Sequence, residues 1–77
     1  MNQFKRRGSE DYSEGFKCSD AYNMNVENGS ITTNDDNTIT VVNKYGEEIG
    51  KPCDYVVMTP YGPHIVRGVI FNYLFEV

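Results

Sequence analysis

Three side chains of this 77-residue sequence could supply a nucleophile and its base: Cys18, Cys53 and the single histidine, His64. A cysteine becomes nucleophilic near neutral pH only as a thiolate, which needs a neighbouring base or cation. The sequence has no glycine-rich oxyanion turn and no third residue spaced to orient the histidine. We therefore expect no enzymatic activity, with His64 on the surface or an edge strand and both cysteines as free, packed thiols.

The same residues together with Asp20 could in principle bind zinc. Structural zinc sites usually carry closely spaced Cys-x2–4-Cys pairs, whereas Cys18 and Cys53 lie far apart in the chain. The pair Asp35-Asp36 resembles the start of a calcium loop, but the glycine and the distal glutamate of such a loop are missing. We expect neither a metal nor another cofactor.

Charge is distributed unevenly along this acidic chain, whose formal net charge is −4. Residues 1–7 carry three basic side chains, and residues 8–36 carry seven acids. An acidic surface repels nucleic acid and anionic membranes, so we expect direct binding to neither, and it attracts basic proteins. The candidate partner-binding acids are Glu10, Asp11, Glu14, Asp20, Glu27, Asp35 and Asp36. The alternative is that these acids only maintain solubility.

We predict that residues 1–15 are a flexible tail, because they contain Gly, Ser and charged residues and show no hydrophobic periodicity. The strands that position the candidate residues follow this tail. Residues 16–77 form one small domain. Residues 22–26 alternate in hydrophobicity as a half-buried strand does. Asn28-Gly29 favours a hairpin turn, so that residues 30–33 return as a second strand.

The second half of the domain continues the strand pattern. We expect a turn at 34–37, a strand over 38–43, a loop over 44–52 and a buried strand over 54–59. A turn at 60–63 precedes a short strand over 64–66. The predicted core is Tyr22, Met24, Val26, Ile31, Ile39, Val41, Tyr55, Val57, Ile65, Phe71 and Phe75.

The C-terminal half resembles a family of small tailed-phage proteins of unknown function that share a Pro-Gly-Asp-Tyr core followed by aliphatic residues. The matching segments are Pro52–Val57, with Cys53 in place of the glycine, Tyr61–Pro63, Ile65-Val66 and Ile70–Glu76. Residues 69–77 fit either a strand or a helix by pattern alone. The family's closing segment looks helical, and the resemblance therefore implies a short terminal helix and a phage origin.

The sequence thus predicts an α+β domain, an antiparallel β-meander of four to five strands with a short C-terminal helix. The predicted function is a non-catalytic phage accessory protein in the host cytoplasm that binds and inhibits a host protein. Its acids would imitate DNA phosphates and occupy the basic site of a DNA-binding or defence protein. Tyr45 and Tyr61 are further candidate contact residues. The alternatives are a virion or assembly component that self-associates through its β edges, for example as a homodimer, and a small ligand-binding domain.

Overall fold

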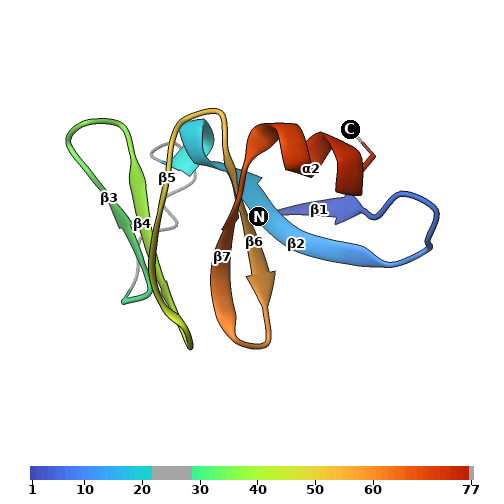
Figure 1. Ribbon diagram of the computed structural model, residues 1–77, viewed down its shortest axis with the longest axis horizontal. Helices are drawn as coiled ribbons and strands as arrows, with labels where there is room; N and C mark the ends of the chain where they lie inside the picture. The colour runs from blue at the N-terminus through green and yellow to red at the C-terminus, as the bar shows by residue number, and fades with distance from the viewer. Residues whose placement is uncertain (22–28, 77) are drawn as a thin grey trace.

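A computed structural model describes residues 1–21 and 29–76 of the chain, which form two antiparallel sheets and a C-terminal α-helix (Figure 1). The predicted strand over residues 22–26 and Asn28 of its turn lie outside the described residues. In chain order, the elements are β1 (Asn2–Lys5), β2 (Tyr12–Lys17), the 3-10 helix η1 (Cys18–Asp20), β3 (Ile31–Thr33), β4 (Ile39–Asn43), β5 (Gly46–Gly50), β6 (Tyr55–Thr59), β7 (Gly62–Val66) and α2 (Gly68–Leu74).

The first sheet has the strand order β1-β2-β6-β7, with β2 and β6 at its centre. Gly15 on β2 lies opposite Val57 on β6. A Cβ atom at Gly15 would lie 2.1 Å from the backbone oxygen of Val56, so only glycine allows these two strands to approach so closely. This long-range pairing joins the N-terminal and C-terminal halves of the chain.

The second sheet has the order β3-β4-β5. The predicted turn over residues 34–37 is confirmed: Asn37 has a φ of 68°, and the backbone and hydroxyl of Thr38 donate to Oδ1 of Asp36. The predicted loop over residues 44–52 is wrong, because Gly46–Gly50 pairs with β4 over its whole length. Its glycines and paired glutamates have low strand propensity and show no alternating pattern. The backbone hydrogen bonds to β4 stabilise the strand instead.

The structure places two strands in the segment predicted as a flexible tail, residues 1–15. Residues 2–5 pair with residues 12–15, which makes a β1–β2 hairpin. Tertiary contacts hold this hairpin in place: the Phe4 ring lies 4.8 Å from that of Phe71, and Lys5 forms a salt bridge with Glu76. These partners lie about 70 positions away in sequence, so a local search for hydrophobic periodicity could not detect them.

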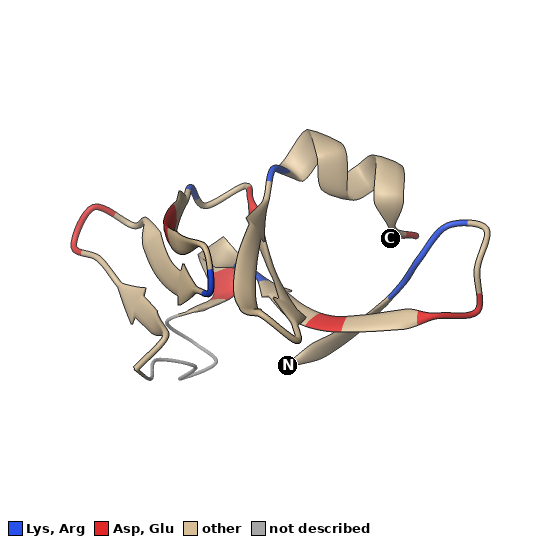
Figure 2. Ribbon diagram, turned by 60° about the horizontal axis from the view of Figure 1, so that its bottom comes forward, with Lys and Arg blue, Asp and Glu red and all other residues tan. Residues whose placement is uncertain are grey.

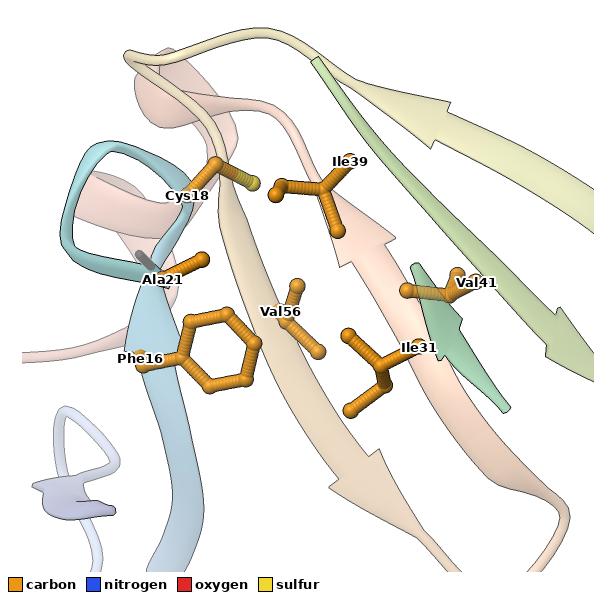
Figure 3. Packing of buried hydrophobic residues seen from close by; sticks show 7 residues of the cluster. All are labelled: Phe16, Cys18, Ala21, Ile31, Ile39, Val41 and Val56. Carbon is orange, nitrogen blue, oxygen red and sulfur yellow. The ribbon is translucent and has the colours of Figure 1, made fainter. Parts of the chain in front are cut away.

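The buried residues that the structure describes form two clusters on opposite faces of β6. One lies between the two sheets and contains Phe16, Cys18, Ala21, Ile31, Ile39, Val41 and Val56 (Figure 3). The other lies under α2 and contains Val57, Phe71 and Phe75, with Phe4, Tyr55 and Val66 packed around them. Because neighbouring strand residues point to opposite faces, Val56 and Val57 serve different clusters. The central strand is therefore buried on both sides.

Much of the predicted core is confirmed. Ile31, Ile39, Val41, Val57, Phe71 and Phe75 are buried, and Tyr55 and Ile65 are half-buried against them. The predicted core residues Tyr22, Met24 and Val26 lie outside the described residues. The predicted core did not include Phe16, Ala21 and Val56, which are all buried, whereas Cys18 is buried as the packed thiol that the sequence predicted.

The predicted fold class is confirmed in outline, since the described chain is mostly antiparallel β-sheet with one short C-terminal helix. A single meander of four to five strands is too simple a description. The strands divide between two sheets, and β2 pairs with β6 instead of with its successor in the chain.

Candidate partner-binding surface

Two tight hairpin turns of the same design present Tyr45 and Tyr61. In each, two residues separate the paired strand ends, the second is the tyrosine, and a glycine follows. These glycines, Gly46 and Gly62, have φ angles of 124° and 110°, which L side chains rarely adopt. The turns join β4 to β5 and β6 to β7, and both tyrosines therefore occupy equivalent positions.

The two turns pack directly against each other. The backbone N–H of Lys44 donates to the carbonyl oxygen of Tyr61 at 2.9 Å. A Cβ atom at Gly62 would lie 3.1 Å from Cα of Asn43, which shows how closely the backbones approach. The two tyrosine rings lie 5.8 Å apart, edge to face, and Lys44 Nζ lies 5.2 Å from the Tyr61 ring centre. We refer to Lys44, Tyr45, Tyr61 and His64 as the tyrosine patch.

A polar network supports the tyrosine patch. Nδ2 of Asn43 donates to Oε2 of Glu48 at 2.6 Å, and its Oδ1 accepts the backbone N–H of Tyr45 at 2.8 Å. Nδ1 of His64 lies 3.1 Å from the same Glu48 oxygen, and the Ile65 N–H donates to the other at 3.0 Å. Partial burial opposes ionisation of Glu48, but these bonds outweigh it and lower its pKa. The network therefore ties both turns to strands β5 and β7.

The surface of these turns is aromatic and largely exposed. Tyr45 is 72% exposed and Tyr61 is 52% exposed, although aromatic rings gain most from burial. His64 is bound to the network through Glu48 and Asn43 and faces Tyr45 at 6.2 Å. The two turns thus present two exposed tyrosines with a lysine and a histidine beside them.

The predicted acids do not gather in one place. Glu10 and Asp11 lie in the β1–β2 turn and Glu14 on β2, whereas Asp35 and Asp36 lie in the β3–β4 turn at the other end of the molecule (Figures 1 and 2). Asp20 lies in η1, and Glu27 is outside the described residues. Asp36 is also engaged internally, because its bonds from Thr38 lower its pKa. The described acids thus form no single acidic face.

Asp54 joins the loop before β6 to the start of α2. Its carboxylate accepts the backbone N–H groups of Lys51 and Gly68 at 2.9 and 3.2 Å, and Nη1 of Arg67 lies 2.6 Å away. Burial alone would raise its pKa, but these three donors outweigh burial and lower it. This carboxylate has a structural task and is not available to a ligand.

The cysteines differ sharply in their surroundings. Both are free thiols; Cys18 is buried in the core and Cys53 is exposed. Burial, reinforced by the nearby Asp54 charge, raises the pKa of Cys18 to about 12. Within the described residues, no group of three or more His, Cys, Asp and Glu side chains is placed to hold a metal ion.

This difference predicts selective alkylation. At about pH 8 the folded protein should take up one carbamidomethyl group from iodoacetamide, at Cys53, because Cys18 is both inaccessible and protonated. Intact-mass measurement followed by peptide mapping checks the site, and denaturant should expose the second thiol. Rapid modification of Cys18 in the folded protein would contradict its burial.

Lys44 and His64 are members of the tyrosine patch that the sequence reasoning did not identify as contact residues. The signal that could have revealed them is the Tyr-Gly dipeptide, which occurs at 45–46 and again at 61–62. Among the described helices, none is long and apolar enough to cross a membrane. Comparisons of the chain with models of protein families, with characterised proteins and with solved structures found no match.

Proposed function

We propose that this chain is a non-catalytic phage accessory protein that binds a host protein through the tyrosine patch and thereby inhibits it. The observation that carries the proposal is the pair of exposed tyrosines held on two apposed, rigid turns. Tyrosine is enriched among the residues that dominate binding energy at interfaces. Its ring also offers a large contact area at low cost in conformational entropy.

Preorganisation strengthens this argument. A partner that docks on a mobile loop loses affinity because the loop must be ordered on binding. Here the Lys44–Tyr61 backbone bond and the Asn43–Glu48–His64 network already fix the turns. The energy gained by covering the two rings is therefore available for binding.

The phage origin and the host cytoplasm rest on the resemblance of residues 52–76 to small tailed-phage proteins. The net charge of −4 suits a basic host protein, such as a nucleic-acid-binding or defence protein. Imitation of DNA phosphates would need acids along one face of the protein. The described acids are divided between two ends of the molecule, which gives the DNA-mimicry hypothesis less support. In our proposal the acids accelerate the encounter, and the tyrosine patch makes the contact.

The first test is a pull-down from host lysate followed by affinity measurement with the purified target. Replacement of both Tyr45 and Tyr61 by alanine should weaken binding about a hundredfold, since two interface tyrosines contribute at least ~1–2 kcal/mol each. Tyr12→Ala is the matched control, because Tyr12 is 59% exposed on β2. It should bind as the unchanged protein does.

Two results would overturn the proposal. One is a specific host target whose affinity is the same for the double tyrosine variant and the unchanged protein. The other is a salt-insensitive homo-oligomer in sedimentation that recovers no host protein at low salt, which would favour the assembly-component alternative. Circular dichroism must show that the double variant keeps its fold, as expected for exposed side chains.

A further inference from the structure

A second apolar surface lies on the solvent side of α2, and the proposed function does not use it. Val69, Ile70, Tyr73 and Leu74 are 75%, 52%, 79% and 49% exposed. Monomeric proteins rarely expose contiguous apolar patches larger than a few hundred Å². Such a patch on an isolated small domain marks an interaction site. We refer to these four residues as the helix face.

The helix face borders an open groove with a cation at its edge. The groove has a volume of about 460 Å³ and is lined by Arg7, Val69, Asn72 and Tyr73. Nε of Arg7 donates to the backbone oxygen of Asn72 at 3.0 Å, which fixes the guanidinium against the helix. A guanidinium has five N–H donors in a planar fork, and this bond uses one of them. The groove thus combines an apolar wall with a positioned carboxylate-binding group.

Both signs of charge occur near this groove: three basic residues lie beside α2, Glu76 pairs with one of them, and Glu10 and Asp11 lie in the same β1–β2 turn. The backbone N–H of Arg7 donates to the carbonyl oxygen of Leu74, and Arg6 bridges to Phe75, so the basic segment of residues 5–7 lies beside the C-terminal end of α2 (Figure 2). Glu76 is bound to Lys5. Arg6 is also held in place, with its guanidinium 5.7 Å from the Phe75 ring centre. Residues 68–74 contain no acid. Basic residues therefore lie beside an exposed apolar face of this acidic chain.

We propose that the helix face and the Arg7 groove bind an amphipathic segment of a partner protein that carries carboxylates beside bulky apolar side chains. The apolar side chains would cover Val69 and Tyr73, and a carboxylate would take the free edge of the Arg7 guanidinium. A second copy of the chain fits less well, because a two-fold contact would bring the same face together twice, and residues 68–74 offer no acid to meet the Arg7 guanidinium. A membrane surface also fits less well, because the seven-residue helix spans only about 10 Å and the protein is acidic.

The test is selection of binders from a displayed library of random peptides against the intact protein. Sequences that depend on the helix face should be enriched in Asp and Glu next to Leu, Ile, Phe or Trp. Tyr73→Ala and Arg7→Gln should each weaken the best synthetic peptide about tenfold or more, whereas Tyr12→Ala and the double Tyr45/Tyr61 variant should not. Backbone NMR shifts on peptide addition should be largest at residues 69–74.

Several outcomes would overturn this proposal and leave the tyrosine patch untouched. Peptides without acid enrichment, or no peptide that depends on Tyr73, would show that the groove does not recognise acidic segments. Sedimentation of a dimer that dissociates on Tyr73→Ala would assign the face to a second copy. Binding to vesicles with anionic lipid that is lost on Tyr73→Ala would assign it to a membrane surface.

Discussion

Replacement of Val57 by Asp should abolish folding. Val57 is 5% exposed on the central strand β6 and packs with Phe71 and Phe75 under α2. A carboxylate there would have no cation to pair with in the cluster and would cost several kcal/mol. A core of this size supplies only about 3–5 kcal/mol. Circular dichroism should show no cooperative thermal transition for this variant.

Val69→Asp is the matched control for the same chemical change. Val69 is 75% exposed on α2, so its carboxylate would remain in water. The melting temperature should stay close to that of the unchanged protein. A cooperative melt of Val57→Asp at the unchanged temperature would contradict the burial of β6 on both faces.

Replacement of Asp54 by Ala should lower the free energy of unfolding by roughly 2–4 kcal/mol. The substitution leaves the N–H groups of Lys51 and Gly68 without their acceptor and removes the partner of Arg67. Because Gly68 is the first residue of α2, the loss of its acceptor should also destabilise the start of the helix. Urea unfolding of both proteins at neutral pH measures the difference.

The same carboxylate gives a pH signature. The pKa of Asp54 is lowered in the folded protein, so its contribution to stability is complete above the unfolded pKa of about 4. That contribution is lost as the pH falls further, through the lowered pKa. Asp54→Ala should therefore lose less stability between pH 7 and acid than the unchanged protein does. Asp35→Asn, at an exposed turn, is the control that should retain the full acid dependence.

The sequence predicted those elements whose structure depends on neighbouring residues, and it missed those that depend on distant strands. Ile39 and Val41 sit in a β-branched run beside an Asn/Asp turn, and the strand and turn followed from that pattern. Strand β5 could not be predicted in this way, because Gly46, Glu47, Glu48 and Gly50 are poor strand residues. Pairing with β4 and the bonds that Glu48 accepts from Ile65 and Asn43 decide its structure.

The same distinction applies to the candidate site. Tyr45 and Tyr61 could be named as contact residues because aromatic side chains in turns are conspicuous. Their contact with each other could not, since it depends on two hairpins from different sheets meeting at Gly62. The sequence also could not predict that the acids lie far apart, because their separation depends on two turns at opposite ends of the molecule.

The contacts of residues 4–6 with residues 71–76 determine the order in which a newly synthesised chain can fold. The buried residues of the cluster between the sheets all lie within residues 16–56, and that half of the core can assemble once β6 has left the ribosome. The cluster under α2 needs Phe71 and Phe75, so Phe4 must wait for nearly seventy further residues before it is covered. Until Phe71 emerges, Phe4 has no ring from α2 to pack against, and exposed apolar surface of this kind favours aggregation.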